Sequence, residues 1–180
     1  YENDILVLIG TSALIIECKS HLLDAPAKRG APLSLIETLE DMVVDAADQA
    51  NRFVECLRSG SRIHSFSTRR GVQNVVDASK VLRFIPLSVT YENLGFVSAD
   101  LKKCVEAGLI KPGSPLVPSI CLTDLEIIVE TLDSQAERLH YLARRSEIER
   151  SMSFVGDERD LFAFYLNNGF NIGDWEDGKE

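Results

Sequence analysis

The chain has 180 residues, of which 45% are hydrophobic and 26% are charged, and its net charge is −9. A chain of this length and composition can bury a hydrophobic core, so we expect one compact domain, or one domain with an appendage. No apolar run reaches the length of a membrane span, and the acidic balance disfavours a general nucleic-acid coat protein.

Cysteine and histidine usage limits the metal and redox chemistry that we expect. The four cysteines include no CxxC pair, and the three histidines lack metal-ligand spacing, which disfavours a structural zinc site. We expect reduced, mostly buried thiols in a cytoplasmic protein.

Positive charge gathers in one segment of this acidic chain. Residues 61–90 have a net charge of +4, whereas residues 1–60 sum to −5 and residues 91–180 to −8. The basic residues of the segment are Arg62, Arg69, Arg70, Lys80 and Arg83. Such a segment is typical of a confined phosphate-contacting surface, with a solvated basic loop as the alternative.

The first half of the chain predicts a hairpin, a loop and a long helix. Two apolar strands, over 4–10 and 11–20, are joined by a tight turn at Gly10. After a loop rich in proline and glycine, a capping box of Ser34 and Glu37 begins a helix that ends at Gly60. Its apolar residues form one stripe for packing on the sheet: they are Leu35, Leu39, Met42, Val43, Ala46, Ala50, Phe53 and Leu57. The polar stretch over 59–74 predicts a mobile loop.

The second half predicts more strands and then mostly helix. A third strand covers 81–90, and Pro86 within it indicates an edge position or a bulge. A short helix over 98–110 and a fourth strand over 116–122 follow. Capping boxes begin helices at Thr123 and Ser134, and a last helix ends near Gly169, before a frayed acidic tail over 173–180.

This order of elements predicts an α/β or α+β core with a helical C-terminal appendage. We expect residues 1–90 to form the main core, with its N-terminal part missing if the chain is a fragment. Residues 91–180 would complete the sheet and add the helical region, packed as one unit with the core. A start at Tyr1 rather than Met indicates a fragment or a processed product of a longer chain.

The end of the second predicted strand carries the candidate site. Strand side chains alternate, so Glu17 and Lys19 share a face while Cys18 points the other way. If the turn is the two-residue Gly10-Thr11 of type II′, Asp4 lies opposite Glu17 on the same face; a three-residue turn would send Asp4 to the other face. Two close carboxylates suit Mg²⁺ or Mn²⁺, and a nearby ammonium can orient a water. The combination indicates phosphodiester cleavage, with an exposed, solvated strand end as the alternative.

Asn3-Asp4, a spacer and Glu17-Cys18-Lys19 resemble the D…(D/E)xK signature of the PD-(D/E)xK nuclease superfamily, and the context is similar to its NERD (nuclease-related domain) branch. The resemblance implies a restriction-endonuclease-like mixed sheet core flanked by helices. It implies that Asp4, Glu17 and the backbone carbonyl of Cys18 bind the metal ion, while Lys19 positions or activates water. The helix of the branch carries a Gln that would be Gln49 here, at the margin of the apolar stripe. Asn3 stands where the family often has Pro, and the acidic helix that commonly precedes the hairpin is not in this sequence.

Two functions stay open at this level. The first is a Mg²⁺-dependent endonuclease acting on DNA, with RNA as an open alternative substrate and with phosphate contacts from Lys28 and Arg29 in the loop after the site. The second is a catalytically inactive nuclease-fold module that binds nucleic acid or a protein partner. We expect no membrane partner, and we expect either a homodimer or a larger chain upstream of Tyr1.

Overall fold

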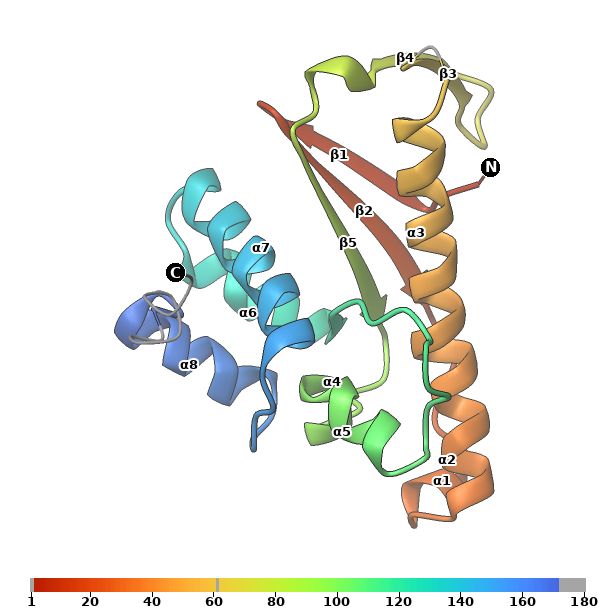
Figure 1. Ribbon diagram of the computed structural model, residues 1–180, viewed down its shortest axis with the longest axis vertical. Coiled ribbons are helices and arrows are strands. Elements are labelled where there is room, and N and C mark those ends of the chain that lie inside the picture. The colour runs from red at the N-terminus through yellow and green to blue at the C-terminus, as the bar shows by residue number, and fades with distance from the viewer. Residues whose placement is uncertain (1, 61, 172–180) are drawn as a thin grey trace.

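The computed structural model describes residues 2–60 and 62–171 of the chain. A mixed four-stranded sheet lies between two helical layers (Figure 1). Its strands, in spatial order, are β1 (Ile5–Ile9), β2 (Ser12–Lys19), β5 (Arg83–Thr90) and β6 (Ser119–Cys121). β1 and β2 are antiparallel, whereas β2, β5 and β6 run parallel. The predicted mixed α/β class is therefore confirmed, and the predicted acidic tail lies outside the described residues.

The β1–β2 hairpin has the predicted two-residue turn. Ile9 pairs with Ser12 and Ile5 with Ile16. Gly10 has a φ of +57°, whereas the φ of Thr11 is not positive. A positive φ at the first position of the turn, and not at the second, is what type II′ requires. The turn chemistry thus sets the register along the whole hairpin.

The long helix covers the predicted range but is interrupted. It consists of α2 (Pro32–Leu39), a π-helical turn η1 (Glu40–Val44) and α3 (Asp45–Arg58). In η1 the Asp45 N–H donates to the Glu40 carbonyl five residues earlier. The extra residue shifts the helical phase, so three consecutive residues, Met42, Val43 and Val44, are all buried.

The predicted start of this helix is wrong. Pro32 occupies the first turn and Ala31 is the N-cap, without a side-chain cap. Because proline at the first position needs no partner for an N–H, the helix begins before Ser34. The predicted capping box at Thr123 is also wrong: α6 (Leu122–Thr131) follows β6 directly, with Cys121 as its N-cap. The box of Ser134 and Glu137 is confirmed.

The predicted loop over 59–74 is wrong in most of its length. Its residues form β3 (Ile63–Ser67) and, with the following residues, β4 (Gln73–Asp77), an antiparallel hairpin outside the main sheet. The reason is a period-two pattern in β3, in which His64 and Phe66 face inward while Ser65 and Ser67 face solvent. The Phe66 ring lies 5.2 Å from that of Phe53 on α3, which anchors the hairpin.

Pro86 does not mark an edge strand, because β5 lies between β2 and β6. The Ser88 N–H donates to the Pro118 carbonyl on the β6 side. Pro86 lies two residues earlier in the strand, so an N–H at its position would point to the same side. The β6 pairing covers only Ser88 to Thr90, so the missing donor of Pro86 falls where no strand adjoins.

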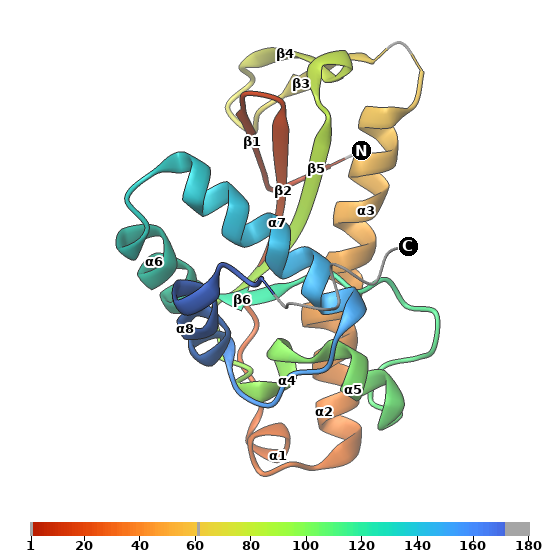
Figure 2. The same cartoon turned by 60° about the vertical axis from the view of Figure 1, so that its left-hand side comes forward.

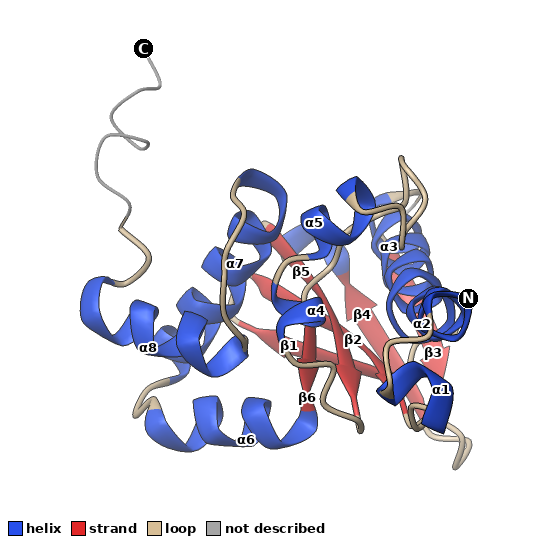
Figure 3. Ribbon diagram, turned by 90° about the horizontal axis from the view of Figure 1, so that it is seen from below, coloured by secondary structure: helices blue, strands red, loops and turns tan. Residues whose placement is uncertain are grey.

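The C-terminal half supplies the second helical layer rather than an appendage. Its helices are α4 (Phe96–Ala99), α5 (Leu101–Glu106), α6, α7 (Gln135–Ser151) and α8 (Glu158–Asn168), which ends at Gly169 as predicted. Figure 2 shows α7 crossing the sheet, and Figure 3 shows α6, α7 and α8 on the side opposite α2 and α3. Leu14, Leu87 and Ile120 of the sheet share one core with Tyr141 and Phe162 of these helices.

The four cysteines carry no disulfide, as expected, but only two of them are buried. Cys104 and Cys121 lie in the interior, Cys56 is partly buried and Cys18 is exposed. Burial raises the pKa of the Cys104 thiol to about 11. Among the described residues, no helix combines the length and apolar character that crossing a membrane would require.

Candidate functional site

Asp4 and Glu17 meet at the open end of the β1–β2 hairpin. The register that pairs Ile5 with Ile16 places Asp4 next to Glu17 in the same alignment. β1 begins only at Ile5, and Asp4 Oδ2 accepts a hydrogen bond of 2.9 Å from the Cys18 N–H. The Asp4 carboxylate therefore accepts the Cys18 N–H, which a backbone carbonyl would accept if β1 were longer. This hydrogen bond fixes the Asp4 side chain beside the end of β2.

Glu17 is buried and incompletely satisfied. Its residue exposure is 4%, and its Oε1 atom has no hydrogen-bond partner within the part of the chain that the structure describes. Burial raises the pKa of Glu17 to about 7, with a further increase from the Asp4 carboxylate and an opposing effect of Lys19. A buried carboxylate oxygen beside a second carboxylate is a position that a cation would stabilise.

Strand geometry directs the backbone carbonyl of Cys18 to the side of β2 on which Asp4 lies. In an antiparallel pair a residue directs its N–H and its C=O toward the same neighbouring strand. Because the Cys18 N–H points to Asp4, its carbonyl points to that side of β2 as well. Two carboxylates and one carbonyl are hard oxygen donors of the kind that Mg²⁺ and Mn²⁺ bind, with water completing the shell. Within residues 2–60 and 62–171 there is no group of three His, Cys, Asp or Glu side chains arranged for a metal.

A cavity of about 420 Å³ opens beside the two carboxylates. It is lined by Glu2, Asp4, Glu17, Gln49 and Arg52. Gln49, the predicted supporting residue, is partly buried on α3, which packs on β2 through Ala50 and Phe53 against Ala13 and Ile15. The helix that covers this face of the sheet thus brings an amide to the acidic pair.

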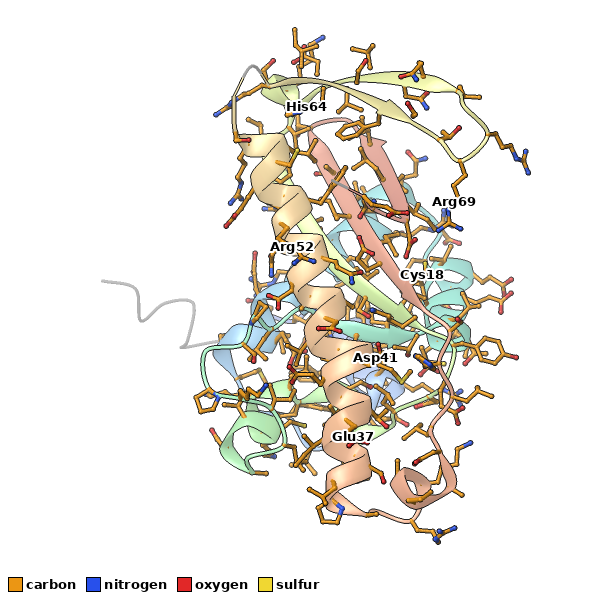
Figure 4. The ribbon with its side chains drawn as sticks, turned by 90° about the vertical axis from the view of Figure 1, so that its right-hand side faces the viewer. Cys18, Glu37, Asp41, Arg52, His64 and Arg69 are labelled. Carbon is orange, nitrogen blue, oxygen red and sulfur yellow. The ribbon has the colours of Figure 1, made fainter. Side chains whose placement is uncertain are left out.

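Glu2 and Arg52 are cavity residues that the sequence reasoning missed. Arg52 follows Gln49 by three residues, the spacing that places two side chains on one face of a helix. Glu2 precedes Asp4 by two residues, the spacing of one face of an extended chain. Both signals are present in the sequence. Figure 4 shows Arg52 on α3, with Cys18 and Arg69 to one side of the helix.

Lys19 lies on the Glu17 face of β2, as the alternation predicts, but it does not line the cavity. Its residue is half-buried, and its positive charge lowers the pKa of Glu17. The Lys19 carbonyl accepts a hydrogen bond of 2.9 Å from the Tyr91 N–H. The backbone of Lys19 is therefore held, and its charge acts on Glu17 without a close ion pair to that carboxylate in the described part of the chain.

The predicted phosphate contacts Lys28 and Arg29 are not brought to the cavity. Lys28 is the last residue of α1 (Ala25–Lys28), and Arg29 is its C-cap. α1 lies at the end of the long helix that is away from the β3–β4 hairpin (Figure 1). Lys28 forms an ion pair of 3.0 Å with Glu92, and Arg29 is exposed. His21, also near the site in sequence, pairs instead with Asp41 of η1.

A different basic residue approaches the site. Arg69, at the tip of the β3–β4 hairpin, has its guanidinium 4.0 Å from Asp4 Oδ1 and 3.9 Å from Glu2 Oε1. Its side chain is 88% exposed, so these contacts are weak and exchangeable. One residue of the basic segment, Arg69, therefore lies beside Asp4 of the carboxylate pair.

Comparisons with models of known protein families, with curated proteins and with solved structures gave no match to this chain. The interpretation of the cavity therefore depends on its own geometry and chemistry.

Proposed function

We propose that the chain is a metal-dependent phosphodiesterase, an endonuclease acting on DNA. The observation that carries the proposal is the unpartnered, buried Oε1 atom of Glu17 next to Asp4. An isolated buried carboxylate oxygen is costly, and a divalent cation between two carboxylates is the simplest group that would remove the cost.

Asp4, Glu17 and the Cys18 carbonyl would hold Mg²⁺ or Mn²⁺. When bound, the ion would supply Lewis-acid activation of a phosphodiester. Lys19 would orient the attacking water and offset negative charge that develops on the phosphate. Its positive charge already lowers the pKa of Glu17, so it would also act on a phosphate bound there. Gln49 would support the substrate or the water from the opposite wall of the cavity.

The order of elements supports a restriction-endonuclease-like core. A hairpin carries the acidic pair, a helix crosses one face of the sheet, and β5 returns parallel to β2. This is the arrangement that the D…ExK resemblance implies for a mixed sheet flanked by helices. The cytoplasmic location, and the assembly as a homodimer or within a longer chain, stay predictions.

The test is cleavage of supercoiled plasmid DNA with Mg²⁺ or Mn²⁺ by the wild type and by Lys19→Ala. We expect nicking by the wild type and a loss of at least a hundredfold in Lys19→Ala, the scale of removing a group that acts on the developing charge. Lys111→Ala is the matched control, because Lys111 is 80% exposed and pairs only weakly, at 3.3 Å, with Glu40. It should cleave like the wild type.

Circular dichroism of each variant separates lost chemistry from lost folding. Equal cleavage by the wild type and Lys19→Ala would overturn the assignment of Lys19 and of the site. Absence of cleavage in every metal, together with retained binding of DNA, would overturn the enzyme in favour of the inactive nucleic-acid-binding module.

A further inference from the structure

We propose that the β3–β4 hairpin is an arm that enters the major groove of duplex DNA and places it against the cavity. The proposal rests on the proposed function for its choice of a phosphodiester substrate, and it adds the form of that substrate. Three features carry it: a ribbon anchored to α3, an exposed outer face, and two arginines at the tip.

The inner face of the hairpin is anchored to α3. Phe66 packs against Phe53, and the His64 ring lies 3.3 Å from the Leu57 carbonyl and stacks on Phe66 at 5.9 Å. Val76 of β4 is buried in the same cluster. The ribbon is therefore held in place at its inner face, and it stands outside the main sheet (Figure 1).

The outer face of the hairpin is exposed and carries groups that can read base edges. Ser65 pairs with Val75, and Ser67 with Gln73, so these four side chains share the face that points away from α3. All four residues are exposed, Val75 at 70%. The Gln73 amide donates to the Ser67 hydroxyl at 2.6 Å, which leaves the Gln73 carbonyl oxygen and the second amide hydrogen for base edges. Hydroxyl and amide groups exchange hydrogen bonds with base edges, and an apolar side chain can contact a thymine methyl group.

The size of the ribbon fits the groove. Each strand has five residues and spans roughly 17 Å, with about 4.8 Å between the strands. The major groove of B-form DNA is about 12 Å wide and admits a two-stranded ribbon. The A-form major groove of duplex RNA is too narrow for this.

The tip of the hairpin joins the ribbon to the cavity. The turn is closed by hydrogen bonds between Thr68 and Val72, and Gly71 takes a φ of +77°. Arg69 and Arg70 are exposed in this turn. Since Arg69 lies within 4.0 Å of Asp4 and 3.9 Å of Glu2, a phosphate held by the tip would be next to the carboxylate pair.

Charge complementarity selects a polyanion as the occupant of this surface. The segment 61–90 has a net charge of +4, whereas the chain as a whole has −9. An acidic protein that approaches DNA must do so through its basic surface, because the remaining surface repels phosphates. The hairpin carries Arg62, Arg69 and Arg70 of that segment.

The test measures binding without cleavage, by fluorescence anisotropy of a labelled 20-base-pair DNA duplex in EDTA. We expect Arg69→Ala/Arg70→Ala to bind roughly tenfold more weakly than the wild type, with a salt dependence of log K shallower by about 1.8. Lys102→Ala/Lys111→Ala removes the same charge from the other end of the molecule and should leave both quantities unchanged. Duplex DNA should bind more tightly than duplex RNA or single-stranded DNA of the same sequence.

The possible outcomes distinguish a failure of the hairpin arm from a failure of the proposed nuclease activity. Equal affinity of the arginine variant and the wild type for duplex DNA would overturn the arm, even if the wild type cleaves plasmid. Equal or tighter binding of duplex RNA or single strands would overturn the major-groove mode. Arginine-dependent duplex binding without cleavage in any metal would uphold the arm and overturn the nuclease.

Discussion

At the scale of single residues, the burial of Glu17 is the feature that most needs a physical reason. Its exposure is 4%, and one of its oxygens has no partner in the described part of the chain. The Cys18 N–H, which follows Glu17 in the chain, donates to Asp4 instead. Burial and Asp4 both disfavour its ionised form, and they outweigh the attraction of Lys19. In the metal-free protein Glu17 is therefore about half protonated at neutral pH, and it is mostly protonated below pH 6.

The first prediction follows from this proton. Unfolded Glu17 titrates near 4.5 and folded Glu17 near 7, so the folded state binds the extra proton between these values. Its contribution to stability is present below pH 4.5 and is lost as the pH rises through 7. In EDTA at pH 8, Glu17→Gln should raise the free energy of unfolding by roughly 1–3 kcal/mol. Urea unfolding at pH 4.5 and pH 8 measures this; an equal effect at both values would contradict the pKa assignment.

The second prediction concerns metal affinity at the same residue. A cation must displace the Glu17 proton, so the Mn²⁺ affinity should fall about tenfold for each pH unit below 7. Isothermal titration calorimetry at pH 6 and pH 7.5 measures it. Glu17→Gln should bind much more weakly at pH 7.5, whereas Asp48→Asn, which changes an exposed acid on α3, should bind like the wild type. Unchanged affinity in Glu17→Gln would remove this carboxylate from the site.

At the scale of elements, the hairpin turn determines whether the two carboxylates meet. Gly10 takes a φ of +57°, and a Cβ at this position would contact nothing within 4 Å. Strain of the backbone, rather than crowding, is thus the cost of substitution. Gly10→Val should destabilise the protein by roughly 1–3 kcal/mol and weaken Mn²⁺ binding through the loosened register. Gly10→Asn, which tolerates the left-handed region, should lose less of both. Equal losses would show that the conformation of the turn does not control the site.

The elements that the sequence predicted correctly are those whose signals are local. The Gly10-Thr11 turn has its own chemistry and sets the register that aligns Asp4 with Glu17. The apolar stripe of the long helix was also predicted, because burial on one face needs only periodicity.

The elements that the sequence missed depend on contacts made elsewhere in the fold. The π-turn η1 lies where the Ser88 hydroxyl donates to the Met42 carbonyl at 3.3 Å, a contact between residues 46 positions apart. The β3–β4 hairpin is stabilised by the Phe66 contact with α3, and its polar composition suggested a loop. Lys28 was expected near the phosphates because it is close in sequence, but α1 carries it to Glu92.

At the scale of the whole molecule, the two halves of the chain share one sheet. α3 covers the face that bears Glu17, while α7 and α8 cover the other face through the core that contains Leu14 and Leu87. The C-terminal helices therefore support β2 from behind, and the rigidity of the site depends on them. A buried ion cluster joins α7 to α8 and to the start of α5.

The last prediction tests this dependence through Arg145. Arg145 has no exposure and pairs with Glu149 at 2.5 Å and Glu158 at 3.0 Å, and the Tyr141 hydroxyl also donates to Glu158. Arg145→Met would leave two buried carboxylates without their cation, which should cost about 3–5 kcal/mol in the free energy of unfolding.

The loss should grow from pH 5 to pH 8, because the uncompensated carboxylates can be neutralised only by protons. Arg159→Ala is the matched control: Arg159 also holds a buried carboxylate, Asp124, at 2.7 Å, but its own side chain is 59% exposed, so water can partly replace it. It should cost less and depend less on pH. Chemical unfolding followed by circular dichroism should show one transition for both variants, since the sheet is common to both halves. Two separate transitions in Arg145→Met, with β2 and α3 unfolding apart from α7 and α8, would show that the C-terminal helices do not stabilise the site.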